Sequence, residues 1–294
     1  MHTATYYIDL LLSGITVGSL YALIAIGYTM VYGILRLINF AHGDIFMMSG
    51  FFMIYVSATL PMAVSIPVVL LMTVLLGVLI ERAAYKPLRS APRMSVMISA
   101  IGVSYLLQNL ATYITGGLAR PYPEISFLKK SFAVGSLNIK IITLLTPVLT
   151  ILLVISLVIF IKHTKTGMAM RAVSKDFDTA RLMGIKVNSV ITVTFIIGSF
   201  LAGVGSILYF TNYGQVSPTI GAMPGLKAFV AAVFGGIGSI PGAFLGGLLL
   251  GIIEAMAKAY ISTNLANSIV FAVLIVVLLV KPAGLLGKSV TEKV

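Results

Sequence analysis

The chain has 294 residues, of which 59% are hydrophobic and only 10% are charged, and it carries a formal net charge of +12. Soluble domains contain about 25% charged residues, so this composition excludes a soluble globular protein and indicates an integral membrane protein. The sequence has no cysteine, which excludes disulfides, thiolate metal sites and cysteine nucleophiles.

Long apolar runs recur along the chain, and several reach the length of about 18 residues that a helix needs to cross a bilayer. The runs are continuous rather than alternating, as in VVLLMTVLLGVLI at 68–80, which favours helices over strands. We expect an all-α polytopic membrane protein with eight or nine transmembrane segments, some of them interrupted, in a single domain over residues 1–294. The predicted spans lie near residues 8–32, 38–57, 66–82, 95–115, 141–161, 189–211, 241–258 and 264–281, with a shorter apolar stretch at 225–237.

Basic residues are distributed unevenly between the predicted loops. Basic clusters follow the third, fifth and last spans, and they share one side if the N-terminus lies outside and the C-terminus lies in the cytoplasm. Cytoplasmic loops carry an excess of Lys and Arg, so this orientation is predicted, although the loop at 116–140 opposes it with four basic residues. The positive net charge is attributed to these loops and not to nucleic-acid binding.

Two segments do not resemble ordinary spans. INFAHGD (38–44) places Asn, His and Asp in an apolar run, and GGIGSIPG (235–242) contains four glycines and a proline. Glycine and proline break helices, so a break is predicted at 235–242. A broken helix inside a membrane is tolerated where protein or a water-filled cavity satisfies the freed backbone groups. Paired interruptions in two halves of a transporter indicate a translocation pathway. The preceding spans, 8–32 and 189–211, are predicted to run in opposite directions, as an inverted repeat requires.

The predicted pathway residues combine the polar groups of the first segment with residues of other spans. An acidic residue inside a membrane is costly unless it meets a partner or water, which favours a pathway role for this cluster. The alternative is that the cluster only holds neighbouring helices together. The three histidines are not clustered, so no metal site is predicted. The candidate pathway residues are Asn39, His42, Asp44, Asn109, Gly238 and Pro241.

The most charged segment runs from Lys162 to Asn188 and holds 8 of the 28 charged residues. Ser174 is a candidate helix cap, Asp176 falls in the first turn and Gly184 is a candidate terminator, which predicts a short amphipathic helix over 174–184. The helix could lie on the lipid surface or dock a soluble partner, and its narrow apolar face favours docking. Phe177 is the predicted anchor and Arg181 the predicted charged contact. The predicted docking residues are Ser174, Asp176, Phe177, Asp178, Ala180, Arg181, Leu182, Met183 and Gly184.

Small residues recur near the start of the predicted span at 241–258. Gly238, Gly242 and Gly246 are spaced four residues apart, and Gly247 and Gly251 form a second pair with the same spacing. Small residues at this spacing let helices approach closely in a membrane. In the same span, Glu254 is predicted to pair with Lys258, four residues further on.

Several motifs resemble those of one family. Asp178-Thr179-Ala180 followed by Gly184 has the spacing of the EAA-x-x-x-G loop of bacterial ABC importer permeases, although the Leu-Pro that ends that loop is absent. Taken together, the motifs cover nearly the whole chain and resemble the permease subunit of the high-affinity branched-chain amino acid ABC importer. The other motifs are VGSLYALIAIGYTMVYGI (17–34), INFAHGD (38–44), IERAAYKPLRSA (80–91), MISAIGVSYLLQN (97–109), MRAVSKDFDTARLMGI (170–185), GLKAFVAAVFGGIGSIPGAFLGGLLLGIIEA (225–255) and VKPAGLLGK (280–288).

The resemblance implies a subunit of the bacterial inner membrane with the larger type of ABC importer permease fold and a cytoplasmic coupling loop at about 162–188. It implies a paralogous second permease subunit, two ATPase subunits and a periplasmic amino-acid-binding protein as partners. The implied function is ATP-driven import of branched-chain amino acids. Permeases for urea or short amides, and an ion-coupled secondary transporter, are the alternatives.

The chain is expected to have no enzymatic activity and no cofactor of its own. Gly287-Lys288-Ser289 mimics the end of a P-loop, but Pro282 occupies the position of the first glycine, so the segment is not expected to hold a nucleotide. The resemblance implies that ATP and Mg²⁺ are bound by the partner ATPase subunits.

Overall fold

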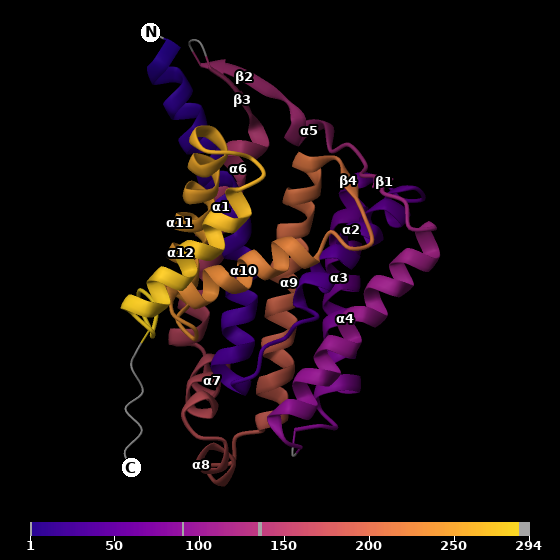
Figure 1. The fold of residues 1–294 in the computed structure, drawn as a ribbon. Helices are drawn as coiled ribbons and strands as arrows, with labels where there is room; N and C mark the ends of the chain where they lie inside the picture. The colour runs from indigo at the N-terminus through magenta and orange to yellow at the C-terminus, as the bar shows by residue number, and fades with distance from the viewer. Residues whose placement is uncertain (1, 90, 135–136, 288–294) are drawn as a thin grey trace.

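The computed structural model describes residues 2–89, 91–134 and 137–287, and Figure 1 shows them as a bundle of helices. These residues form twelve α-helices, one π-helical turn and four short strands. In chain order the elements are α1 (His2–Leu35), α2 (His42–Ser57), α3 (Met62–Ile80), η1 (Glu81–Tyr85), α4 (Arg93–Thr115), β1 (Arg120–Pro121), α5 (Ser126–Lys129), β2 (Ser131–Val134), β3 (Leu137–Lys140), α6 (Ile141–His163), α7 (Lys165–Lys175), α8 (Phe177–Leu182), α9 (Val187–Tyr213), β4 (Gln215–Val216), α10 (Ala222–Gly235), α11 (Ile240–Tyr260) and α12 (Ala266–Val280).

The predicted all-α membrane architecture is confirmed. Each predicted span, and the stretch at 225–237, corresponds to a helix, and six helices are long and apolar enough to cross a membrane. The other three, α2, α10 and α12, have 16, 14 and 15 residues. At about 1.5 Å per residue they are shorter than the bilayer core of about 30 Å. The chain is therefore a multi-pass membrane protein in which α2 and α10 are the short helices next to the interrupted segments.

Helix α1 forms the centre of the bundle and packs against α6, α9, α10 and α11. Its closest neighbour is α11, because glycines face each other across this contact. A Cβ atom added to Gly251 would lie 2.2 Å from the Cα of Gly18, and one added to Gly247 would lie 2.6 Å from the Cα of Ala22. The predicted tight packing by small residues is thus confirmed, and the contact is internal to this chain.

The predicted helix break at 235–242 is also confirmed. Helix α10 ends at Gly235, and Gly236 and Gly238 adopt the left-handed φ values of 107° and 90° that favour glycine. Helix α11 then starts at Ile240, where the hydroxyl of Ser239 accepts a hydrogen bond of 3.2 Å from the amide of Gly242. The chain reverses between Gly235 and Ile240 because the two glycines adopt left-handed φ values and the hydroxyl of Ser239 caps the next helix.

The two long helices α1 and α9 run in opposite directions, as predicted (Figure 1). Each is followed by a non-helical segment, 36–41 and 214–221 respectively, and then by a short helix, α2 or α10. The first turns of these short helices are in contact. A Cβ atom on Gly43 would lie 2.6 Å from the carbonyl oxygen of Gly221 and 3.0 Å from the Cα of Gly225. The interrupted segment that is the counterpart of 38–44 is therefore 214–221. The sequence had predicted 235–242 as this counterpart.

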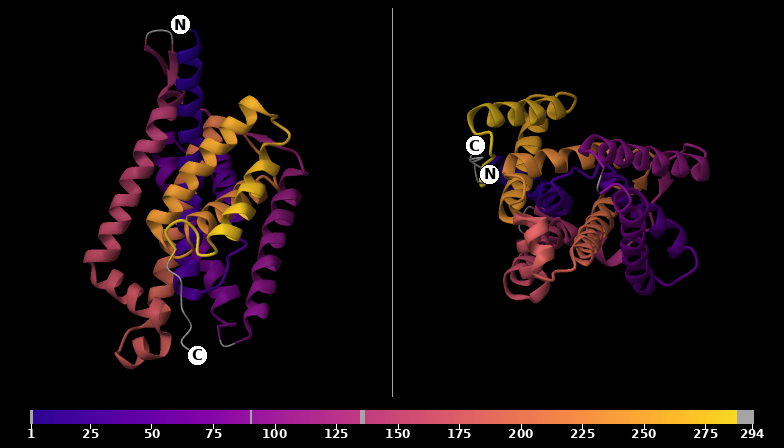
Figure 2. Two further views of the ribbon diagram at one scale, coloured as in Figure 1. Left: turned by 60° about the vertical axis from the view of Figure 1, so that its left-hand side comes forward. Right: turned by 90° about the horizontal axis from the view of Figure 1, so that it is seen from below.

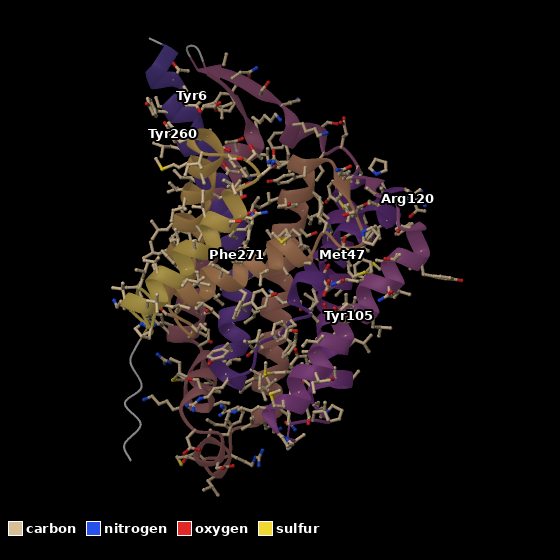
Figure 3. The ribbon with its side chains drawn as sticks, viewed as in Figure 1. Tyr6, Met47, Tyr105, Arg120, Tyr260 and Phe271 are labelled. Atoms are coloured by element: carbon tan, nitrogen blue, oxygen red, sulfur yellow. The ribbon has the colours of Figure 1, made fainter. Side chains whose placement is uncertain are left out.

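The charged segment and the outer strands lie at opposite ends of the molecule. Helices α7 and α8 share one end with the loop that precedes α4, whereas the start of α1 and the β2–β3 hairpin lie at the other (Figure 1). Helices α4 and α6 flank the molecule on opposite sides (Figure 2). Tyr6 and Tyr260 are about half exposed and lie close together at the α1 end (Figure 3), where aromatic side chains suit a membrane interface.

The two β-ribbons are small and antiparallel. Strand β1 pairs with β4, with Arg120 opposite Val216, and β2 pairs with β3 in a hairpin. They lie at the end that contains the basic residues of the 116–140 loop. The basic loop at 82–93 and the charged segment share the other end, so their predicted grouping is confirmed; Lys288 and Lys293 lie outside the described residues.

Candidate functional site

The charged segment folds into two helices, α7 and α8, and not into the single helix predicted at 174–184. Asp176 caps α8: its Oδ1 accepts hydrogen bonds from the amides of Asp178 (2.8 Å) and Thr179 (3.0 Å). The predicted cap, Ser174, instead lies in the last turn of α7 and donates a hydrogen bond to the carbonyl oxygen of Arg171. The hydrogen bonds that the Asp176 carboxylate accepts are charge-assisted. Bonds from Thr179 and Asp178 lower the pKa of Asp176 below its usual value.

Gly184 ends α8, as predicted. Its φ of 80° lies in the left-handed region, and its amide donates to the carbonyl oxygen of Arg181 at 3.0 Å. The amide of Ile185 donates to the carbonyl oxygen of Ala180 at 3.1 Å, which completes a Schellman motif. Helix α8 is therefore a rigidly terminated unit of six residues.

The apolar residues of the α8 segment divide into inward and outward groups. Ala180 is buried, and Phe177 is half-buried and packs against the core. Leu182 and Met183 are 88% and 78% exposed. The predicted anchor, Phe177, thus contacts this chain itself, and the exposed apolar side chains at this end of α8 are Leu182 and Met183.

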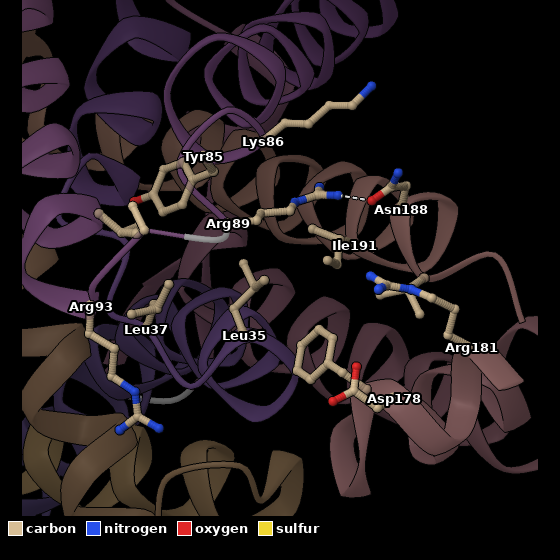
Figure 4. Close-up of a pocket in the computed structure, with 14 residues that line it drawn as sticks. Leu35, Leu37, Tyr85, Lys86, Arg89, Arg93, Asp178, Arg181, Asn188 and Ile191 are labelled. Carbon is tan, nitrogen blue, oxygen red and sulfur yellow. Dashed lines mark hydrogen bonds between the residues drawn. The ribbon is translucent and has the colours of Figure 1, made fainter.

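A cavity of about 650 Å³ separates α8 from the segment after α1 and from the start of α4. Figure 4 shows Asp178 and Arg181 on one side of this cavity and Leu35, Leu37 and Arg93 on the other. Lys86 and Arg89 also line it. The cavity is strongly basic, and it connects α8 with the chain that leads into the interrupted segment.

An ion pair between the partly exposed Arg89 and the buried Glu81 holds the loop before α4 against α9. The guanidinium of Arg89 donates to Glu81, whose side chain is 1% exposed, and to the side-chain oxygen of Asn188 (Figure 4). The hydroxyl of Thr192 donates to the other oxygen of Glu81 at 3.1 Å. Since Asn188 and Thr192 lie in the first turns of α9, the end of the charged segment is tied to the π-helical turn η1.

A second buried network joins α1, α10 and α11 around Glu254. The predicted pair with Lys258 is confirmed at 2.6 Å. Lys227 lies 2.8 Å from the same carboxylate, and Tyr21 donates a hydrogen bond of 2.8 Å to it. Two cations and a hydroxyl therefore compensate the charge of Glu254.

A pocket of about 350 Å³ lies where the first turns of α2 and α10 face the middle of α4. The carboxylate of Asp44 lines it. Asp44 accepts hydrogen bonds from the hydroxyl of Ser104 at 2.5 Å and from Nε2 of Gln108 at 3.0 Å. The other walls are largely apolar and are formed by Tyr28, Ile38, Phe40, Gly43, Ile101, Tyr105, Gly221, Ala222, Gly225, Leu226 and Phe229.

The charge of Asp44 is poorly compensated in this position. An ionised Asp at the centre of a transmembrane helix costs about 2.5–3.5 kcal/mol. Hydrogen bonds between membrane helices contribute about 0.6 kcal/mol each, and the position of Asp44 in the first turn of α2 adds about 0.3–1 kcal/mol from the helix dipole. The neutral contacts of Asp44 therefore offset only part of the cost of its burial.

The other predicted pathway residues do not converge on this pocket. The side chains of Asn39 and His42 are 1% exposed and point into the packed interior: Tyr85 donates a hydrogen bond to Asn39, and the ring of His42 packs edge-on against Tyr28. Asn109 is exposed on α4 and donates to the carbonyl oxygen of Tyr105.

The two predicted pathway residues from the glycine-rich turn lie elsewhere. Gly238 faces Gly33 of α1, and Pro241 is exposed in the first turn of α11. Asp44 is thus the single predicted pathway residue whose side chain lines the pocket at the start of α2.

The residues that complete this pocket were not among the predicted pathway residues. Ser104 and Gln108 are one helical turn apart and share a face of α4, and Gln108 immediately precedes the residue chosen instead, Asn109. Gly221 and Gly225 are also four residues apart, with Pro224 between them. A search for polar pairs and small-residue pairs at this spacing would have found all four.

These features define a class of protein: a polytopic helical membrane protein with interrupted helices, a largely apolar pocket that contains one buried carboxylate, and a short capped helix exposed at one end. The family model described as "Branched-chain amino acid transport system / permease component" matches residues 10–279. The chain belongs to this family, whose members are transport subunits and not enzymes.

Individual relatives agree with this assignment. The chain is 43% identical to the high-affinity branched-chain amino acid transport system permease protein LivH of Escherichia coli (strain K12), over 98% of each chain. It is 42% identical to LivH of Salmonella typhimurium and to BraD, a permease protein of the same description from Pseudomonas aeruginosa, again over 98% of each chain. No solved structure matches the chain.

Proposed function

We propose that this chain is the permease subunit of an ATP-driven importer that moves leucine, isoleucine and valine into the cytoplasm. It would form a single permease domain over residues 1–294, with the larger type of importer permease fold, in the bacterial inner membrane. Its N-terminus would lie outside and its C-terminus in the cytoplasm. The LivH and BraD relatives that align over 98% of the chain support this substrate class, because they are branched-chain amino acid permeases.

The observation that carries the ATP-driven mechanism is helix α8. It is held by a charged cap and a glycine terminator, and it exposes Leu182 and Met183 at the end that contains the basic 82–93 loop. Large apolar side chains exposed on a rigid, charged helix mark a surface for a protein partner. The partner proposed for this surface is one of two ATPase subunits, which would bind the ATP and Mg²⁺. A paralogous permease and a periplasmic amino-acid-binding protein would complete the importer.

The cavity next to α8 supplies a physical link to the interrupted segment. Phe177 and Arg181 line it from the charged segment, whereas Leu35 and Leu37 line it from the chain that leads into α2. A movement of α8 against this cavity would shift the start of α2, which contributes to the intramembrane pocket. The ATPase would change the permease only if it bound two permease conformations with different affinity.

Substitution at the exposed face of α8 tests the docking surface. The variant Leu182→Ala/Met183→Ala should lose the ATPase subunits during purification in detergent and should lose uptake. Met168→Ala is the matched control, because Met168 is an apolar side chain on α7 that is 51% exposed. Retention of the ATPase by the double variant at the level of the control would contradict the docking role.

Transport by the assembled complex tests the substrate and the energy source. Proteoliposomes with both permeases, the ATPases and the binding protein should accumulate radiolabelled leucine only when ATP is supplied to the ATPase side. Uptake of urea in place of leucine would point to the sister permeases for urea or short amides. Uptake driven by an ion gradient in liposomes that contain this chain alone would overturn the proposal.

A further inference from the structure

We propose that the intramembrane pocket binds the α-ammonium group of the transported amino acid, with the Asp44 carboxylate as its counter-ion. The inference rests on the proposed function, because it assigns a recognition site to the same substrates. The observation that carries it is a buried carboxylate without a cation, at the wall of a cavity.

Asp44 differs from the other buried carboxylates of the chain. Three acidic residues are buried among the described residues: Asp44, Glu81 and Glu254. Glu81 pairs with Arg89, and Glu254 pairs with two lysines. No cation forms an ion pair with Asp44 anywhere in the described ranges. Since the protein compensates each of the other two charges internally, the missing cation at Asp44 is the feature that a ligand would supply.

The geometry of the pocket suits an ammonium group. Ser104 and Gln108 each donate one hydrogen bond to a different oxygen of Asp44. Each carboxylate oxygen has two lone pairs, so both oxygens keep acceptor capacity for an ammonium, which has three donors. The two neutral donors fix the orientation of the carboxylate without neutralising its charge.

The rest of the pocket suits a small aliphatic side chain. Its volume of about 350 Å³ falls in the range of small-molecule sites. Ile38, Phe40, Ile101, Leu226 and Phe229 supply apolar walls from three different parts of the chain. A single buried anion among apolar walls matches a ligand with one cationic group and a hydrocarbon side chain.

The charge of Asp44 is not needed for a purely structural link between α2 and α4. A neutral amide at position 44 could also link the two helices, accepting a hydrogen bond from Gln108 and donating one to the hydroxyl of Ser104, without the desolvation cost of a charge. The variant Asp44→Asn separates the two roles, because it keeps an acceptor oxygen and removes the charge. Asn109→Ala is the matched control, because Asn109 is a polar residue of α4 that lies outside the pocket and donates to the backbone of Tyr105.

The test measures ligand protection of a single cysteine in the assembled transporter. The chain has no cysteine of its own, so Ile101→Cys, with cysteine-free partner subunits, places one thiol at the pocket wall. Three probes share a branched hydrocarbon skeleton: leucine, 3-methylbutylamine, which lacks the carboxylate, and 4-methylpentanoate, which lacks the ammonium. Leucine and 3-methylbutylamine should slow maleimide labelling at concentrations about tenfold or more below those needed for 4-methylpentanoate.

Asp44→Asn should abolish this preference for the ammonium-containing probes and should lower leucine uptake by about tenfold or more. Asn109→Ala should keep both the preference and the wild-type uptake. Equal protection by all three probes, protection by none of them, or leucine uptake at the wild-type level in Asp44→Asn would each overturn the assignment.

The two proposals can fail separately in this experiment. Protection depends on binding alone and needs no ATP. A complex that shows ammonium-dependent protection but no ATP-driven leucine uptake would refute the proposed function and support the pocket. A complex that imports leucine with Asp44→Asn at the wild-type rate would refute the pocket and support the proposed function.

Discussion

The contact between α1 and α11 allows a stability prediction from interatomic distances. A Cβ atom at position 251 would lie 2.2 Å from both the Cα and the amide nitrogen of Gly18 and 2.5 Å from the carbonyl oxygen of Gly14. Ordinary contacts begin at about 3.4 Å, so α1 and α11 would have to move apart locally by about 1.2 Å. The atoms in the way belong to the backbone, and a change of side-chain rotamer cannot relieve the overlap.

The expected effect of Gly251→Ala is therefore a loss of stability. Overpacking costs about 1–3 kcal/mol, whereas replacing Gly with Ala inside a helix gains at most about 1 kcal/mol. We expect a net loss of about 1–2 kcal/mol, and a fall in Tm of a few degrees. Because α1 also packs against α9 and α10, the shift should propagate to the centre of the bundle.

The assay is the fraction of the detergent-solubilised protein that stays monodisperse after heating to a series of temperatures. Gly102→Ala is the matched control, because Gly102 lies in the middle of α4 and no described atom falls within 4 Å of an added Cβ. The control should keep the wild-type Tm or raise it slightly. A Tm for Gly251→Ala equal to that of Gly102→Ala would refute the argument that backbone contact sets the spacing of α1 and α11.

Three further predictions concern the charged end of the molecule. Arg89→Ala should lower stability by about 3 kcal/mol because it leaves Glu81 buried without its cation; thermal unfolding would measure this, and an unchanged Tm would contradict it. Gly184→Ala should cost about 1–2 kcal/mol because φ is 80° at this position, and limited proteolysis within α8 should become faster; an unchanged cleavage rate would speak against strain there. The pKa of Asp176 is lowered by its hydrogen bonds, so its cap is complete above the usual Asp pKa of about 3.9 and is lost as the pH falls through the lowered value. Hydrogen exchange at the amide of Thr179 should become faster as the cap is lost at low pH. Asp176→Ala should cause the same loss of protection at neutral pH. Asp176→Asn should not, because Asn is also a good cap. Equal protection in Asp176→Ala and wild type would exclude the capping role.

Much of the local structure could be read from the sequence, because it depends on short-range chemistry. Gly184 ends α8 as predicted, since a terminator needs only a residue that tolerates a left-handed φ. The start of α8 was misplaced because Ser174 and Asp176 are both good caps. The choice between them depended on where α7 ended, and α7 continues to Lys175 because its apolar residues Met170 and Val173 are buried against the bundle.

The pathway residues show the limit of this kind of prediction. Asn39, His42 and Asp44 lie within six residues and looked equivalent in the sequence. Each turn of a helix or loop directs neighbouring side chains differently, so Asn39 and His42 point into the interior and Asp44 lines the pocket. The same effect explains why the predicted residue Asn109 does not line the pocket although its neighbour Gln108 does. Successive side chains on a helix point about 100° apart.

The sequence by itself determined the membrane class, the order of the helices, the positions where they break and the resemblance to a permease family. These properties depend on hydrophobicity, on backbone preferences and on motifs that are contiguous in the chain. The tertiary structure decided which broken segments meet, which carboxylates have cations and which face of α8 is exposed. Residues from α2, α4 and α10 form the Asp44 pocket although they are more than 170 residues apart at the extremes. Tertiary contacts bring them together, because α2 packs against both α10 and α4.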